Sequence, residues 1–147
     1  MKDFKLQSVL NYRKILEENI QKNLANLNKD LCDENEILEK IIYELEIYKI
    51  KLQNKSKNGV KLSDILFYFN SIEYLADTKR KQKKKISKIE NEIKFKKTEL
   101  LNARTNKKMI EELKNKSVRE WNININKKEQ KYLDDIGITI YNKKIKR

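Results

Sequence analysis

The chain has 147 residues, of which 38% are hydrophobic and 39% are charged, and its formal net charge is +13. Such a composition is poor for a compact core and better suited to a narrow hydrophobic seam between helices. Proline and histidine are absent, glycine occurs twice and Cys32 is the single cysteine. These counts argue against glycine-rich phosphate loops, histidine chemistry, cysteine-cluster zinc sites and disulfide frameworks. We therefore expect a helical protein that is not an enzyme, needs no cofactor and keeps Cys32 as a free thiol.

The first third of the chain carries a narrow stripe of mostly apolar residues. Steps of three and four alternate along it, as in a coiled-coil helix. The predicted seam consists of Leu6, Val9, Arg13, Leu16, Ile20, Leu24, Leu27, Leu31, Glu34, Leu38, Ile41, Leu45, Tyr48 and Leu52. Two successive steps of four meet at Ile20, which indicates a stutter that relaxes the supercoil locally. The pattern predicts a first helix over residues 3–55.

A turn is predicted over residues 56–62, because the seam pattern stops there and Asn58-Gly59 tolerates a positive φ. Ser63 or Asp64 is expected to cap a second helix over residues 63–142. Its predicted seam consists of Ile72, Leu75, Lys79, Gln82, Ile86, Ile89, Ile93, Lys96, Leu100, Ala103, Lys107 and Ile110. The stripe continues with looser spacing through Leu113, Ser117, Trp121, Ile125, Tyr132 and Ile136. β-branched residues among the asparagines at 122–126 predict fraying or a bend.

Two long helices joined by a short turn must run antiparallel, so residues whose numbers sum to about 118 should be neighbours. The sequence thus predicts an all-α fold, a long two-helix antiparallel coiled-coil hairpin with a longer C-terminal helix. Residues 1–147 are expected to form a single coiled-coil domain. The last 25 to 30 residues, roughly, should extend beyond the first helix.

Charge is concentrated in one part of the second helix, since residues 79–97 hold ten basic residues and two acidic ones. The antiparallel register would place residues 79–88 opposite residues 30–39, which hold five acids, so pairing between the helices is the leading explanation. A nucleic-acid backbone is the alternative partner for such a block, although no aromatic platform interleaves it. We expect no nucleic-acid binding.

Aromatic residues gather on both sides of the turn. They are Tyr43, Tyr48, Phe67, Tyr68, Phe69 and Tyr74. A narrow seam cannot cover that much aromatic surface, so some of these rings should be exposed. Two interpretations remain open: an exposed patch that binds a partner, or a core that widens near the turn.

Several segments together resemble the FliJ family of the bacterial flagellar type III export apparatus. They are residues 4–13 (FKLQSVLNYR), Gly59 followed by Tyr68, Ile72 and Leu75, residues 107–114 (KKMIEELK) and residues 129–136 (EQKYLDDI). The resemblance covers nearly the whole chain. Asp135 stands where the family often has Glu, and the lysine block is heavier than the family pattern suggests.

The resemblance implies a cytoplasmic, non-catalytic coiled-coil stalk, similar to the γ subunit of rotary ATPases, that serves flagellar protein export, motility and chemotaxis. It implies binding to the hexameric export ATPase FliI, whose assembly and activity the stalk would promote. A contact with the cytoplasmic part of the export-gate membrane protein FlhA is also implied, and export chaperones are further expected partners. The expected position is peripheral, at the inner face of the membrane apparatus, without direct insertion into the membrane.

Site residues follow from the resemblance by position. The gate contact near the turn would involve Ile41, Tyr48, Ile72 and Leu75. The ATPase contact at the other end would involve Glu129, Lys131, Leu133, Asp134 and Asp135. Two alternatives compete with this function: a basic coiled coil that binds nucleic acid, and a dimeric scaffold in which the seam pairs between chains.

Overall fold

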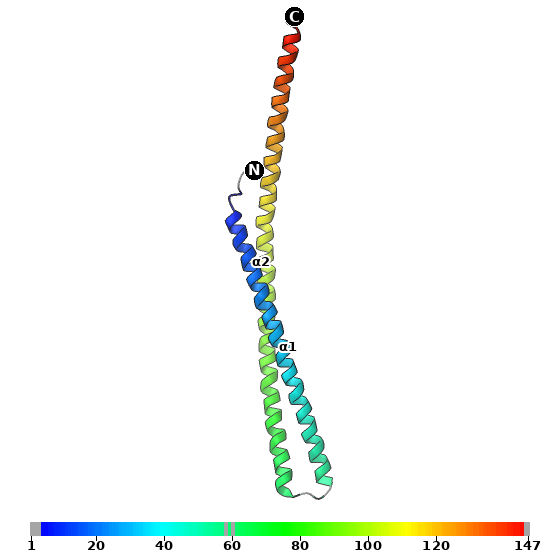
Figure 1. Ribbon diagram of the computed structural model, residues 1–147. Coiled ribbons are helices and arrows are strands. Elements are labelled where there is room, and N and C mark those ends of the chain that lie inside the picture. Colours follow the sequence, from blue (N-terminus) through cyan, green and yellow to red (C-terminus); the bar gives the residue numbers. More distant parts are fainter. Residues whose placement is uncertain (1–3, 58, 60, 146–147) are drawn as a thin grey trace. The chain divides into compact units, whose positions relative to one another are not determined.

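The computed structural model describes residues 4–57, 59 and 61–145, which form two long helices, α1 (Gln7–Lys57) and α2 (Leu62–Ile145) (Figure 1). The predicted all-α fold of two long helices packed against each other is confirmed. Contacts divide the chain into two compact units: Met1–Glu17 with Asn102–Arg147, and Glu18–Leu101. Each unit contains a stretch of both helices.

The helix ends differ slightly from the predicted ones. Helix α1 begins at Gln7 rather than near residue 3, after a turn in which the Gln7 N–H donates to the Phe4 carbonyl at 3.0 Å. Helix α2 begins at Leu62, because the Lys61 carbonyl accepts from the N–H groups of Asp64 and Ile65 at 3.1 and 3.3 Å. Ser63 and Asp64 therefore lie inside the helix and neither is its N-cap. Between the helices Gly59 has a φ of 67°, the left-handed conformation that glycine adopts without steric cost.

In the unit Glu18–Leu101, the two helix stretches form an antiparallel hairpin around one hydrophobic seam. Its most buried residues, each at most 8% exposed, are Ile20, Leu45, Leu75, Ile86, Ile93 and Leu100. Cross-helix contacts of Glu34 with Gln82 and Lys85 set the register. The residue numbers sum to 116 in the first pair and to 119 in the second. The predicted register near 118 is thus confirmed for this unit. Cys32 is a free, exposed thiol on α1.

In the unit Met1–Glu17 with Asn102–Arg147, the seam of α1 is shifted from its predicted position. Leu10 is 1% exposed and Glu17 is 8% exposed, whereas Leu6 and Val9 are 37% and 36% exposed. Counted from Leu10, the steps through Arg13 and Glu17 to the next α1 seam residues alternate three and four without interruption. The predicted stutter is therefore wrong, and so are the seam assignments of Leu6 and Val9.

The far part of α2 leaves the seam gradually. Half-buried residues continue to Ile125, but Leu113 and Ser117 are exposed, and Lys114 and Val118 lie in their place. The helix passes through residues 122–126 without interruption, and residues 126–145, here called the C-terminal segment, are all exposed. None of the described helices is long and apolar enough to cross a membrane.

Candidate functional site

A groove near the turn, here called the tip groove, lies between α1 and α2 in the unit Glu18–Leu101. It measures about 410 Å³ and is lined by Glu44, Tyr48, Phe67, Asn70, Ser71, Tyr74 and Leu75. Leu75 is buried and Tyr48 half-buried, whereas Phe67 and Tyr74 are 58% and 71% exposed. The groove therefore has an apolar floor and an accessible aromatic rim, which is a surface suited to an apolar anchor from a partner.

Ring contacts hold the aromatic side chains around the tip groove in place. The centroid of the Tyr48 ring lies 5.9 Å from that of Tyr68, and the Phe67 ring meets Tyr68 edge-on at 5.6 Å. The ammonium groups of Lys51 and Lys55 lie 5.8 and 4.9 Å from the ring centroids of Tyr48 and Tyr68, within cation–π range. These contacts restrict the rotamers of both tyrosines, so less side-chain entropy is lost when a partner binds.

Of the four residues assigned by resemblance to the gate contact, the structure brings Tyr48 and Leu75 together in the tip groove. Ile41 and Ile72 are half-buried seam residues and do not line it. The exposed rings, among them Tyr43 at 69% and Phe69 at 60%, were not in that set. Their clustering near the turn was visible in the sequence, and the expectation that some would be exposed is confirmed.

The residues assigned to the ATPase contact all lie in the exposed C-terminal segment. They are Glu129, Lys131, Leu133, Asp134 and Asp135. The Asp134 carboxylate accepts a hydrogen bond from Gln130 Nε2 at 3.2 Å, one turn away, and the Asp135 carbonyl accepts from the Thr139 hydroxyl at 2.9 Å. These are the contacts of an isolated helix surface.

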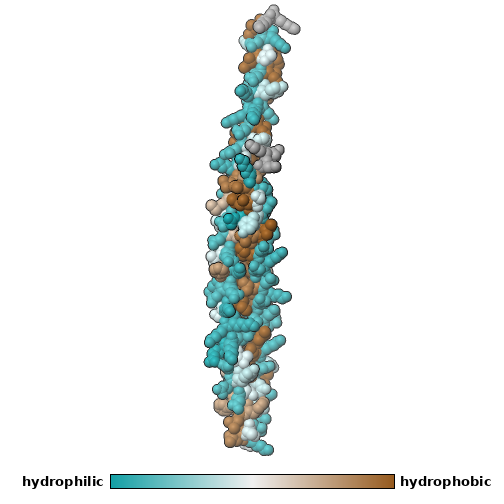
Figure 2. All heavy atoms as spheres, turned by 90° about the vertical axis from the view of Figure 1, so that its left-hand side faces the viewer, coloured by the Kyte–Doolittle hydropathy of each residue, from teal (hydrophilic) through white to brown (hydrophobic). Residues whose placement is uncertain are grey.

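Large apolar side chains are also exposed in the C-terminal segment, at 38% or more. They are Tyr132, Leu133, Ile136, Ile138, Ile140, Tyr141 and Ile145. Figure 2 shows hydrophobic side chains at the surface among hydrophilic ones at the end that carries the C-terminus. This segment exposes far more apolar surface than a solvated helix needs.

Two acidic residues occupy seam positions of α1, and cations or amides of α2 satisfy both. Gln82 Nε2 donates to Oε2 and to the backbone carbonyl of Glu34 at 2.5 and 2.9 Å, and Lys85 Nζ lies 2.9 Å from Glu34 Oε1. The hydrogen bond from Gln82, followed by that from Lys85, lowers the pKa of the Glu34 carboxyl below its usual value. Glu34 was expected in the seam as a polar interruption.

Glu17 forms the second polar layer, in the other unit. Lys107 Nζ lies 2.5 Å from Glu17 Oε2, and Arg104 Nε lies 3.3 Å from Oε1. The hydrogen bond with Lys107 is the largest cause that lowers the pKa of Glu17 and raises that of Lys107. One turn earlier, the buried Nε of Arg13 has no hydrogen-bond partner among the described residues. The sequence prediction missed Glu17, which an unbroken heptad counted from Leu10 would have placed in the seam.

The lysine block pairs less with α1 than the sequence suggested. Arg80 and Lys81 both pair with Asp77 of their own helix, and Lys96 pairs with Glu99. In the part of the chain that the structure describes, Lys85 alone among the basic residues 79–97 reaches an α1 carboxylate. Pairing between the helices therefore accounts for one cation of the block and leaves most of them facing solvent.

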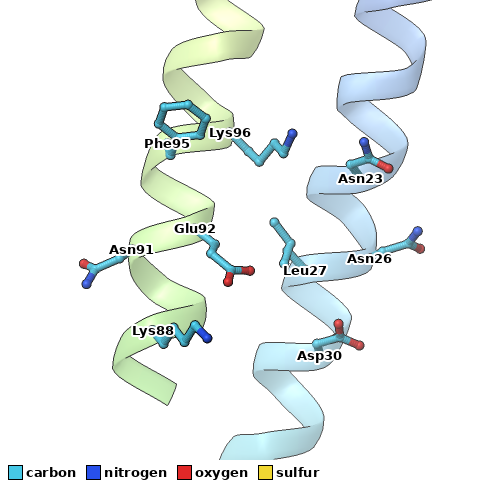
Figure 3. A pocket seen from close by; sticks show the side chains of 9 residues that line it. All are labelled: Asn23, Asn26, Leu27, Asp30, Lys88, Asn91, Glu92, Phe95 and Lys96. Atoms are coloured by element: carbon cyan, nitrogen blue, oxygen red, sulfur yellow. The ribbon is translucent and has the colours of Figure 1, made fainter. Parts of the chain in front are cut away.

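A second groove of about 620 Å³ lies beside the seam of the same unit (Figure 3). It is lined by Asn23, Asn26, Leu27, Asp30, Lys88, Asn91, Glu92, Phe95 and Lys96. Leu27 points toward α2, and Glu92 and Lys96 point toward α1. No group of histidine, cysteine and carboxylate side chains among the described residues could hold a metal ion.

Comparison with models of protein families gives a match over nearly the whole chain. The sequence model of the family described as "Flagellar FliJ protein" matches residues 1–146. No curated protein and no solved structure matches the chain.

Proposed function

This chain belongs to the family of flagellar FliJ proteins and is a component of flagellar protein export; we propose that it acts there as a non-catalytic stalk for the hexameric export ATPase. In this proposal the C-terminal segment enters the ring of ATPase subunits. Binding one state of the subunits better than another favours assembly and conformational change of the ring. The tip groove, at the other end of α2, contacts the cytoplasmic part of the export-gate protein.

The observation that carries the proposal is the exposure of residues 126–145 as continuous helix. A helix gains most of its stability in water from packing of an apolar face, and this segment has large apolar side chains but no packed face. A partner that surrounds it would bury these side chains. The assigned residues Glu129, Lys131, Asp134 and Asp135 would then lie at a partner surface together with Leu133.

The position of the gate contact is supported by the tip groove. Tyr48 and Leu75 contribute to its wall and floor, and the exposed rings of Phe67 and Tyr74 lie within reach of a partner. Ile41 and Ile72 would support the groove from the seam. We propose the cytoplasmic part of the export gate as the partner at this end and export chaperones as further partners.

Two pairs of substitutions test both ends and serve as controls for each other. Tyr132→Ser with Leu133→Ser should reduce binding to the export ATPase, its hexamer formation and its ATP turnover by about tenfold, while gate binding is unchanged. Phe67→Ser with Tyr74→Ser should have the opposite pattern. All four side chains are exposed, so neither pair removes a buried contact.

Purified full-length chain, ATPase and gate cytoplasmic domain are sufficient for the measurement. Light scattering reports hexamers, phosphate release reports turnover and calorimetry reports gate binding. An unchanged ATPase response in both variants would exclude the stalk role. Loss of both functions from either pair would mean that the two ends are assigned wrongly.

A further inference from the structure

One exposed stripe of α2 in the unit Glu18–Leu101 is used by neither end of the proposed stalk. It is here called the outer stripe, and its residues recur every three or four positions: Leu62, Leu66, Phe69, Glu73, Asp77, Arg80, Lys84 and Lys88. Such spacing keeps residues on one side of a helix. The seam side of the same helix is occupied by the buried Leu75, Ile86 and Ile93, so the outer stripe faces away from α1 as far as Lys84. Lys88, at its end, also lines the second groove beside the seam.

The second half of the outer stripe is strongly cationic. Arg80, Lys84 and Lys88 follow one another at intervals of about 6 Å along the axis, and Lys81 and Lys83 flank them. The side chains of Arg80 and Lys81 are 69% and 76% exposed although both pair with Asp77. These two cations neutralise that carboxylate. Among the described residues, no ion pair engages Lys83, Lys84 or Lys88.

The first half of the outer stripe is apolar. Leu62, Leu66 and Phe69 are 72%, 52% and 60% exposed. Glu73 is the one acid of the stripe that no cation pairs with in the described structure. A surface that joins three exposed apolar side chains to a row of cations is typical of helices that lie on anionic membranes.

We propose that the outer stripe binds the surface of an anionic phospholipid bilayer. Arg80, Lys84 and Lys88 contact headgroup phosphates, and Leu62, Leu66 and Phe69 enter the interfacial region. A nucleic-acid backbone would also attract the cations, but it offers no environment for two exposed leucines. A helix that lies on a bilayer in this way buries its apolar side chains only at the boundary between headgroups and acyl chains.

Flotation of the full chain with vesicles tests this proposal. Vesicles of phosphatidylcholine alone are compared with vesicles that also contain phosphatidylglycerol, at low salt and at about 0.15 M salt. The variant Lys83→Gln, Lys84→Gln, Lys88→Gln should bind the mixed vesicles roughly 100-fold more weakly. The matched control is Lys22→Gln, Lys29→Gln, Lys40→Gln on α1, which removes the same charge from exposed positions and should bind nearly as the unchanged chain does.

A second variant separates the apolar part from the cationic part. Leu62→Ser with Leu66→Ser should retain binding at low salt and lose most of it at 0.15 M, roughly, where the cations are screened. Circular dichroism of all variants checks that the helices persist. Equal losses from the two lysine triples would show attraction by net charge alone and overturn the proposal. Binding of a duplex DNA probe as tight as that of mixed vesicles at the higher salt would overturn it as well.

Discussion

Glu17 shows how a single carboxylate is accommodated in an otherwise hydrophobic seam. It is 8% exposed, and its partners Lys107 and Arg104 come from α2. A buried charge is costly without partners, so the two cations offset the desolvation of this carboxylate. Because a shift of α2 by one turn would remove both partners, Glu17 also favours one register over its neighbours.

The pH dependence of stability should reflect this layer. The pKa of Glu17 is lowered from its ordinary 4.5, so its contribution is complete above that pH and is lost as the pH falls through the lowered pKa in the folded chain. The pKa of Lys107 is raised from 10.5, so its contribution is complete below that pH and is lost as the pH rises through the raised pKa. Stability from this pair therefore persists between the two limits.

Glu17→Gln should lower the free energy of unfolding at neutral pH by about 1 to 2 kcal/mol, because it removes the charge-assisted bonds with Lys107 and with the half-exposed Arg104. It should also flatten the acid limb of a plot of stability against pH. Urea unfolding across the pH range measures both effects. Glu18→Gln is the matched control, since Glu18 is exposed, and an equally large effect there would contradict the role of the seam carboxylate.

At the scale of the element, the two glycines occupy opposite environments. Gly59 has a φ of 67° in the turn, whereas Gly137 lies inside α2, and a methyl group added to either would meet nothing within 4 Å. The two sites therefore do not differ in the space available for a side chain. They differ in backbone conformation, because an L-residue is strained at positive φ and is favoured over glycine inside a helix.

The same substitution should therefore have opposite effects at the two positions. Gly137→Ala should stabilise the helix of the C-terminal segment by about 1 kcal/mol, seen as slower amide exchange over the neighbouring turns. Gly59→Ala should destabilise the hairpin turn by roughly 1 kcal/mol, seen as faster exchange at the ends of both helices. If alanine changed the stability in the same direction at both sites, the assigned backbone conformations would be contradicted.

The seam positions of the two helices show how much of the fold could be predicted from the sequence. Positions from Ile20 to Leu52 and from Ile72 to Ile110 were predicted as they lie, because repeated apolar heptads admit one continuous stripe. The start of α1 was predicted wrongly, because Leu6, Val9 and Leu10 offer two stripes of similar hydrophobicity. The choice depends on Glu17 meeting cations from distant parts of the chain, which local spacing does not reveal.

The candidate sites were predicted less completely than the elements. Resemblance assigned Tyr48 and Leu75, which do meet in the tip groove, but the accessible rim is formed by Phe67 and Tyr74. Seam spacing identifies the residues that pack between helices and not those that remain open to a partner. The cationic outer stripe was obscured for a similar reason, since charge counts and the antiparallel register together suggested pairing with α1.

At the scale of the whole molecule, each compact unit contains stretches of both helices. The seam in each unit is thus completed within one chain, and no second copy is needed to bury it. The net charge of +13 further opposes self-association. We therefore expect a monomer in place of the dimeric scaffold that the sequence left open.

Light scattering at successive dilutions should therefore give the mass of a single chain, 17.8 kDa, at every concentration. Addition of salt tests the electrostatic part, because screening weakens the repulsion between copies. A mass of twice that value at low concentration would show that the seam pairs between chains, contrary to the packing within each unit.

The single thiol of Cys32 offers a practical consequence. It is exposed on α1, whereas every residue of the outer stripe belongs to α2. A nitroxide or fluorophore attached there would label each molecule once, without any engineered cysteine, on the helix that does not carry the outer stripe. Spectroscopy could then follow the binding of the chain to vesicles, while the outer stripe itself carries no chemical modification.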